Sequence, residues 1–252
     1  CMPIQAATLP IALEGRDVAG QAQTGTGKSA AFLLAAMHWL MSRPVAADKV
    51  GPWGIILAPT RELAVQIHKD AETLGWFTGM DFACIYGGTG YESQRKALER
   101  GADIVIGTPG RIIDFYKQRV FSLDNIEVCV LDEADRMFDM GFIADIRYLL
   151  RRMPAPDQRL NMLFSATLSE RVRELAYEHM NEPESVQIES DTITADRVRQ
   201  TLYHVENNQK IGLLIGVLRQ QEPTRTLLFV NTKRDADRVA AYLTGNDIKA
   251  AV

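Results

Sequence analysis

Two short segments of the sequence combine residue types that bind and act on phosphate groups. Ala22–Ser29 reads A-Q-T-G-T-G-K-S, the spacing of a Walker A phosphate loop with alanine in place of its first glycine. In such a loop, backbone N–H groups and Lys28 bind the phosphates, and the Ser29 hydroxyl binds Mg²⁺. About a hundred residues later, Val128–Asp135 reads V-C-V-L-D-E-A-D, an apolar run that ends at two adjacent carboxylates. The pair predicts a nucleoside-triphosphate site.

The second segment supplies the groups that the chemistry requires. A buried strand ending at Asp132 brings a carboxylate to the same metal ion as Ser29, and Glu133 can orient or deprotonate the attacking water. A solvated helix start would also favour acids, and Lys28 alone could be a surface lysine, but a cation there opposes the helix dipole. We therefore expect Glu133, Lys28 and Asp132 to be catalytic and Ser29 and Asp132 to bind the metal.

The elements that must position these residues alternate along the chain. Seven β-rich runs alternate with segments of helical periodicity, which predicts βαβ units and a mostly parallel sheet covered by helices on both faces. The predicted strands are Asp17–Gln21, Gly54–Ala58, Phe82–Tyr86, Asp103–Ile106, Glu127–Leu131, Asn161–Phe164 and Ser185–Ile188. The predicted helices are Lys28–Met41, Glu62–Leu74, Tyr91–Glu99, Ile112–Lys117, Ile143–Arg152 and Glu170–His179.

Polar and glycine-containing segments follow six of the predicted strands. Ligands of parallel sheets gather at the carboxyl ends of the strands, so all six segments should lie at one edge and form a composite site. These segments are Ala22–Ser29, Pro59–Ala64, Gly87–Gly88, Thr108–Arg111, Asp132–Asp135 and Ser165–Thr167.

The periodicity weakens over residues 190–199, which we interpret as a linker between a first domain of residues 1–189 and a partial second domain of residues 200–252. In the second domain we expect strands at Thr201–Val205, Thr226–Val230 and Ile248–Val252, and helices at Ile211–Gln220 and Ala236–Leu243.

The composition is that of an ordinary globular protein, with 46% hydrophobic and 24% charged residues. The net charge of −4 argues against bulk electrostatic coating of nucleic acid but leaves room for a local groove. The three cysteines have no metal-ligand spacing, which favours a reducing, cytoplasmic compartment. We expect the three tryptophans, Trp39, Trp53 and Trp76, to be buried or partly buried.

These ordered motifs resemble those of the DEAD-box ATP-dependent RNA helicases. The resemblance rests on D-E-A-D at Asp132–Asp135, the phosphate loop, P-T-R-E-L-A, Gly-Gly, T-P-G-R and S-A-T, with L-L-F-V-N-T-K at Leu227–Lys233 like the first motif of a second RecA-like domain. The sequence D-R-M-F-D-M-G-F, which follows Glu133–Ala134, is most similar to the corresponding segment of bacterial degradosome-type helicases.

The resemblance implies a RecA-like fold, ATP and Mg²⁺ as cofactors, and RNA as a substrate bound through its backbone, independent of base sequence. It also implies partnership with an RNA-degradation complex. The longest apolar stretch, Ala30–Met41, is too short to span a bilayer, so we expect no membrane partner. Gln5 would read adenine, since its amide both donates and accepts. The cofactor-binding residues would be Gln5, Ala22, Gln23, Thr24, Gly25, Thr26, Gly27, Lys28 and Ser29.

The resemblance assigns two further groups of residues. Asp135, Ser165 and Thr167 would couple nucleotide state to RNA binding, although Thr167 could instead cap the helix that follows. The exposed backbone N–H groups, hydroxyls and arginines of the remaining motifs suit phosphodiester oxygens. The RNA-binding residues would be Pro59, Thr60, Arg61, Gly87, Gly88, Thr108, Pro109, Gly110 and Arg111.

Two features depart from the family pattern. The aromatic residue upstream of Gln5 would precede Cys1, and the arginine-rich motif of the second domain does not occur before Val252. We therefore expect this chain alone to be inactive in unwinding. The alternatives are a non-catalytic RNA- or partner-binding module made of the first domain, and a P-loop ATPase that acts on DNA or protein.

Overall fold

The computed structural model describes residues 1–23, 25–43, 51–188, 199 and 201–252. The chain divides into two compact units, residues 1–191 and 192–252, and each is described by itself. The predicted linker, residues 190–199, lies outside the described residues except for Arg199.

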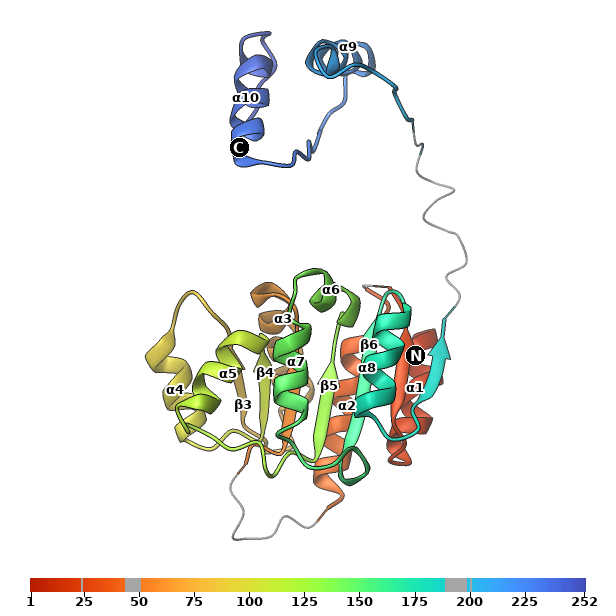
Figure 1. Ribbon diagram of the computed structural model, residues 1–252, viewed down its shortest axis with the longest axis vertical. Helices are drawn as coiled ribbons and strands as arrows, with labels where there is room; N and C mark the ends of the chain where they lie inside the picture. The colour runs from red at the N-terminus through yellow and green to blue at the C-terminus, as the bar shows by residue number, and fades with distance from the viewer. Residues whose placement is uncertain (24, 44–50, 189–198, 200) are drawn as a thin grey trace. The chain divides into compact units, whose positions relative to one another are not determined.

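The first unit is built on a parallel sheet of seven strands in its described part, in the order β3-β4-β2-β5-β6-β1-β7 (Figure 1). The inner strands are continuous apolar runs because both of their faces are buried, which is typical of parallel sheets. The strands are β1 (Val18–Gln21), β2 (Gly54–Leu57), β3 (Phe82–Ile85), β4 (Ile104–Gly107), β5 (Val128–Leu131), β6 (Leu160–Ser165) and β7 (Glu184–Gln187).

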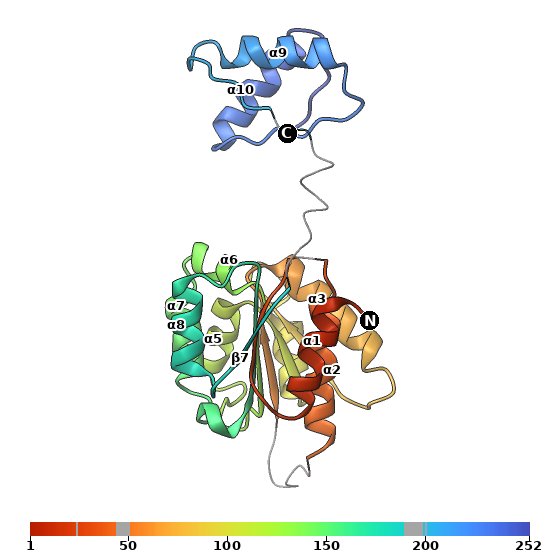
Figure 2. The same ribbon diagram turned by 90° about the vertical axis from the view of Figure 1, so that its right-hand side faces the viewer.

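Helices cover both faces of the sheet, with α1 to α3 on one side and α4 to α8 on the other (Figure 2). Each layer closes a separate hydrophobic core against the sheet. The helices are α1 (Pro3–Leu13), α2 (Lys28–Met41), α3 (Arg61–Leu74), α4 (Tyr91–Glu99), α5 (Pro109–Lys117), α6 (Ala134–Asp139), α7 (Ile143–Leu150), the short 3₁₀ helix η1 (Pro156–Gln158) and α8 (Glu170–His179).

The parallel sheet, its seven strands and the six helices predicted for this unit are confirmed, with strand bounds that differ by at most one residue. Two α-helices, α1 and α6, and the short 3₁₀ helix η1 were missed. Helix α1 is apolar on most sides and so lacks a clear periodic stripe, and α6 is too short to show a period. Helix α5 begins at Pro109 rather than Ile112, because proline suits the first turn of a helix.

Strand β1 lies between β6 and β7, so the first strand of the chain closes onto the last two. The buried Asp17 carboxylate, just before β1, fixes this closure at the amino ends of the strands. It accepts hydrogen bonds from the backbone N–H and side-chain amide of Asn161, both at 2.8 Å, and from the Asn181 N–H at 2.7 Å. The buried Arg159 guanidinium binds carbonyl oxygens nearby, at Pro154 and His179.

Trp76 corrects one expectation. Trp53 is buried and Trp39 is half-buried, but the Trp76 side chain is 76% exposed. It follows Gly75, where α3 ends, and so lies on a surface connection rather than on the packed side of the helix.

The described part of the second unit contains two helices, α9 (Lys210–Gln221) and α10 (Lys233–Thr244), near the predicted positions. The predicted strands Thr201–Val205, Thr226–Val230 and Ile248–Val252 are wrong for this structure: the three segments form no ladder. A strand exists only where a neighbouring strand satisfies its backbone groups, and no strand pairing involves these segments in the described part of the unit.

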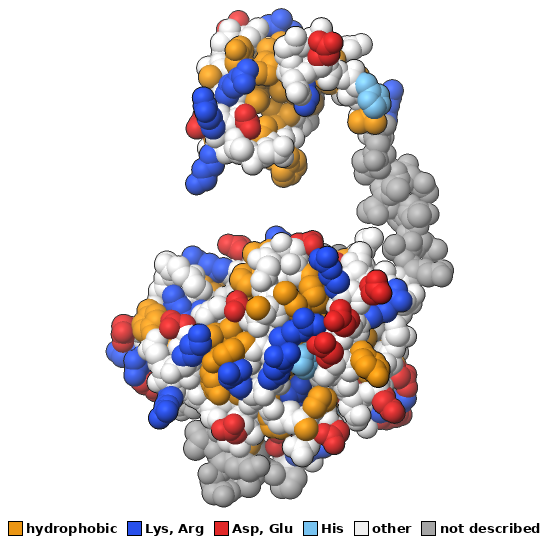
Figure 3. Space-filling model, viewed as in Figure 1, with side chains coloured by type: hydrophobic (Ala, Val, Ile, Leu, Met, Phe, Trp, Pro, Cys, Tyr) orange, Lys and Arg blue, Asp and Glu red, His pale blue; other side chains and the backbone are white. Residues whose placement is uncertain are grey.

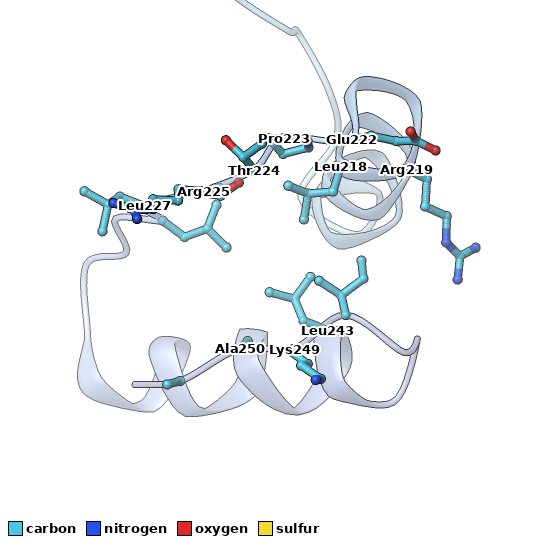
Figure 4. A pocket seen from close by; sticks show the side chains of 14 residues that line it. Leu218, Arg219, Glu222, Pro223, Thr224, Arg225, Leu227, Leu243, Lys249 and Ala250 are labelled. Carbon is cyan, nitrogen blue, oxygen red and sulfur yellow. The ribbon is translucent and has the colours of Figure 1, made fainter.

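The same unit contains a pocket of about 580 Å³, lined by side chains of both helices, among them Leu218 and Leu243, and by the chain around Arg225 (Figure 4). Its lining includes only Leu227 and Leu228 from the motifs identified in the sequence.

Candidate functional site

The loop between β1 and α2 has the backbone conformation of a phosphate cradle. Gly25 and Gly27 have φ of 82° and 85°, a left-handed region that favours glycine, and Gly27 directly precedes α2. The Thr26 hydroxyl closes the turn by donating to the Gln23 carbonyl oxygen at 2.7 Å. Thr24 lies outside the described residues. The first N–H groups of this fourteen-residue helix have no carbonyl partner within the helix, so they suit an anion.

Lys28 lies almost completely buried at this helix start. Its ammonium donates to the Ala22 carbonyl oxygen at 2.9 Å and lies 3.8 Å from the Asp132 carboxylate. A buried cation at a helix N-terminus opposes the helix dipole, so the helix itself gives no reason for a lysine. The arrangement holds a positive charge at the mouth of the phosphate loop.

Asp132 follows β5 directly and is 2% exposed. Burial raises its pKa to about 6, although the neighbouring Lys28 charge and the Glu133 N–H, which donates to the carboxylate at 2.9 Å, oppose the shift. A carboxyl whose pKa is raised on folding stabilises the fold below its unfolded pKa, near 3.8, and this contribution is lost as pH rises through about 6. The ionised form at neutral pH is therefore costly, which is typical of functional carboxylates.

The donor set of Ser29 and Asp132 fits Mg²⁺. This ion binds through one or two carboxylates together with substrate phosphates, and does not need a cage made only of protein groups. No cluster of three or more histidine, cysteine or acidic side chains suited to a metal occurs among the described residues.

Glu133 has a left-handed backbone, with φ of 50°, which is uncommon for a residue other than glycine. Glu133 directly precedes α6, so the chain turns here from the end of β5 into the helix. Its carboxylate lies 3.3 Å from the Arg136 guanidinium. Glu133 and Asp132 share one pocket of about 400 Å³ with the phosphate loop.

Helix α3 forms the remaining wall of this pocket, through Gln66, Asp70 and Thr73. These three residues were not predicted from the sequence. They are polar residues on the surface of an amphipathic helix, and no motif distinguishes them from ordinary solvent-facing positions.

Asp135 connects the segment after β5 to the segment after β6. Its N–H donates to the Ser165 hydroxyl, and its carboxylate accepts from the Thr167 N–H and hydroxyl, each at 3.1 Å. Burial opposes ionisation of this carboxyl, but the hydrogen bonds from Ser165, Arg136 and Thr167 outweigh it and lower the pKa. The structure thus brings the three predicted coupling residues together.

Gln5 contacts the phosphate loop from α1. Its side-chain amide donates to the Gly27 carbonyl oxygen at 3.1 Å, and its oxygen accepts from the Met2 N–H at 2.9 Å. The amide would occupy the space of any side chain at position 27, since a Cβ there would lie 2.6 Å from the Gln5 nitrogen.

The segments after β2 and β3 lie next to each other at the same edge of the sheet. Thr60 caps α3 by accepting from the Leu63 N–H, and the Arg61 guanidinium lies 4.8 Å from the centre of the Tyr86 ring. Pro59 is buried beneath them, and the Gly87–Gly88 pair is exposed.

The segment after β4 starts α5, with Thr108 before the helix, Pro109 buried at its first position and Gly110 exposed. Arg111 is folded against the aromatic rings of Tyr91 and Phe115, and one of its guanidinium nitrogens is buried without a hydrogen-bond partner in the described part of the chain. The predicted RNA-binding residues therefore share one edge, while Arg111 points inward.

Within the described residues, no helix has the length and apolar character needed to cross a membrane.

Comparisons with known proteins agree with this geometry. A family model described as DEAD/DEAH box helicase matches residues 2–175. The ATP-dependent RNA helicase RhlB of Xanthomonas oryzae is 58% identical over 255 residues, covering 100% of this chain and 44% of the relative. The same-named protein of Pseudoalteromonas atlantica is 57% identical, covering 96% of this chain and 58% of the relative. The chain thus spans about half the length of these curated relatives.

Two solved structures are also similar. A DEAD box protein from Methanococcus jannaschii is 34% identical with a TM-score of 0.67, covering 97% of this chain and 64% of that chain. A hypothetical ATP-dependent RNA helicase from Sulfolobus tokodaii is 29% identical with a TM-score of 0.66, covering 95% of this chain and 67% of that chain.

Proposed function

Because the chain belongs to the DEAD/DEAH box helicase family, we propose that it is the ATP-binding part of an ATP-dependent RNA helicase. In this proposal, RNA-stimulated ATP hydrolysis drives local unwinding of RNA duplexes. The observation that carries the proposal is the single pocket in which the phosphate loop, Lys28, Asp132 and Glu133 meet. The relatives named ATP-dependent RNA helicase RhlB support the same assignment.

The phosphate loop and the two carboxylates of the pocket each have a role in the proposal. The phosphate loop and Lys28 bind the triphosphate, and Ser29 and Asp132 hold Mg²⁺, which would neutralise charge on the phosphates when bound. Glu133 orients the attacking water and takes its proton. Lys28 and the N–H groups at the start of α2 stabilise the charge that develops on the transferred phosphoryl group.

RNA binds at the same edge of the sheet, through the segments after β2, β3 and β4. Thr60, Arg61, the Gly87–Gly88 pair and Thr108–Gly110 offer hydroxyls, N–H groups and the Arg61 cation to the phosphodiester backbone, so binding is independent of base sequence. The hydrogen bonds of Asp135 to Ser165 and Thr167 transmit nucleotide state between neighbouring strand ends.

The domain organisation forms part of the proposal. Residues 1–189 make a RecA-like ATP-binding domain, residues 190–199 a linker, and residues 200–252 a part of a second RecA-like domain. An RNA-degradation complex is the proposed setting, on the resemblance of the sequence after Glu133 to degradosome-type helicases. The proposed compartment is the cytoplasm, which suits the free thiols of Cys84 and Cys129.

The proposal predicts RNA-stimulated ATP turnover. Phosphate release is measured in a protein extended to the length of its curated relatives, with no nucleic acid, with single-stranded RNA, and with DNA of the same sequence. RNA should stimulate turnover and DNA should not, because the proposed RNA-binding segments also contact the 2′-hydroxyl, which DNA lacks. Equal stimulation by DNA would favour a DNA-directed ATPase, and no turnover would favour a non-catalytic module.

A second prediction tests the role of Gln5 in reading adenine. Calorimetric titrations of the 252-residue chain with ATP and GTP should show about a tenfold preference for ATP, the size expected for one bidentate contact to a base. Gln5→Ala should remove the preference. The ratio of the two affinities isolates base reading from the Gly27 contact, because loss of that contact affects both nucleotides alike. Equal affinities in the parent chain would exclude the role.

A further inference from the structure

A basic patch lies on the face of the first unit formed by α5 and α7. Lys117 ends α5 and Arg119 follows it, while Arg151 and Arg152 follow α7. Two of the four cations, Lys117 and Arg152, lie over the ring of Tyr148. Figure 3 shows Lys and Arg side chains gathered over these helices, beside the acidic side chains of α8.

Two of the cations converge on one aromatic ring. The Lys117 ammonium lies 5.3 Å and the Arg152 guanidinium 3.5 Å from the centre of the Tyr148 ring. Arg152 is held there by donating to the Tyr148 carbonyl oxygen at 2.8 Å. A cation at the end of a helix complements the helix dipole, but the dipole does not account for two cations brought to the same ring.

No acid neutralises the patch. Among the described residues, none of the four cations of the patch takes part in an ion pair. By contrast, Arg147 of α7 forms ion pairs with Glu174 and Glu178 of α8. Arg151 of the patch also acts on a half-buried neighbour, His179: partial burial lowers the pKa of His179, Glu178 opposes this shift, and Arg151 lowers the pKa further together with Arg159 and Arg147, which lie outside the patch. The patch is a surplus of positive charge on an acidic chain.

The patch is separate from the candidate site. A helix that connects two parallel strands runs back across the sheet, so its carboxyl end lies opposite the edge where the strands end. Lys117 and Arg151 lie at such carboxyl ends, while the phosphate loop and the RNA-side segments lie at the other edge (Figure 1). A ligand at the patch would therefore leave the nucleotide pocket open.

We propose that the basic patch binds an acidic segment of a partner protein. Guanidinium and ammonium groups form their strongest hydrogen bonds with carboxylates and phosphates. The Tyr148 ring is engaged by two cations, so it offers no platform for base stacking, which disfavours single-stranded nucleic acid. Half-buried Val120 and Phe121, which follow Arg119, offer apolar contact to the carbon atoms of a peptide. This role goes beyond ATP hydrolysis and RNA binding.

The test uses the 252-residue chain and a short fluorescein-labelled peptide rich in glutamate, with its glutamine counterpart as the uncharged probe. Fluorescence anisotropy should show binding of the glutamate peptide that weakens as salt is added, and no binding of the glutamine peptide. The double variant Lys117→Gln with Arg151→Gln should bind about tenfold more weakly, since each exposed charge contributes modestly. Both side chains are exposed, and circular dichroism verifies the fold.

The matched control is Lys69→Gln with Arg100→Gln, which removes the same charge from exposed positions outside the patch. It should bind the peptide like the parent chain. Equal losses in the two double variants would overturn the proposal, because net charge alone would then explain binding. If a single-stranded RNA displaces the peptide and loses affinity in the patch variant but not in the control, the patch binds nucleic acid instead. Arg119→Gln removes a single charge of the patch and gives a second measurement of its contribution to peptide affinity.

Discussion

Substituting Lys28 with alanine is expected to weaken ATP binding by the 252-residue chain about a hundredfold, the size of a charge-assisted contact to a phosphate. Affinity for adenosine, which has no phosphate, should change little. The reason is the position of the ammonium, which lies at the start of α2 next to Asp132 and the phosphate loop. Calorimetric titrations with ATP, ADP and adenosine measure the effect.

The adenosine titration also serves as the test of folding, because Lys28→Ala leaves the buried Asp132 carboxylate without its cation. Lys69→Ala, an exposed lysine on α3, is the control for a lost charge and should bind all three ligands normally. An equal loss of affinity for adenosine and ATP would mean that Lys28 maintains the loop rather than binding phosphate.

Substituting Glu133 with glutamine is expected to slow ATP hydrolysis by about 10²–10⁴-fold, the usual contribution of a general base, while ATP binding is retained. Glutamine keeps the shape of the side chain but cannot take a proton from the attacking water. Turnover is measured with RNA in a protein extended to the length of its curated relatives, and ATP binding in the 252-residue chain. The ATP-bound variant should also hold RNA longer.

Arg136→Gln is the matched control. It removes the ion pair at 3.3 Å but keeps the Glu133 carboxylate, so turnover should stay near that of the parent. If Glu133→Gln hydrolyses ATP at the parent rate, another base activates the water. If both variants are equally slow, the ion pair, and not the basicity of Glu133, is what matters.

The sequence was a good guide to the first unit because its strands are buried on both faces. Runs such as Gly54–Leu57 and Val128–Leu131 are apolar throughout and are interrupted by glycine, proline or charge where the chain leaves the sheet. The parallel arrangement then brings the segments that follow these strands to one edge, which is why motifs far apart in sequence could be assigned to one site.

The contacts that could not be predicted depend on how one element packs on another. Gln66 and Asp70 reach the pocket only because α3 lies against α2. The Arg111 guanidinium lies against the rings of Tyr91 on α4 and Phe115 on α5, a contact between two helices that no motif in the sequence indicates. The second-unit strands failed for a related reason, since a β pattern forms a strand only beside a partner.

Because β1 lies between β6 and β7, the newly made chain cannot pair β1 until these later strands have been synthesised. Asp17 meets Asn161, 144 residues later, and the phosphate loop follows directly behind β1. At about 5–20 residues per second, a ribosome takes roughly 7–30 s to make that stretch. Throughout this interval β1 is complete but lacks both of its neighbouring strands. A nascent chain therefore carries an unpaired strand and an unformed nucleotide site until most of the first unit has been synthesised, and unpaired strand edges of this kind are prone to aggregation.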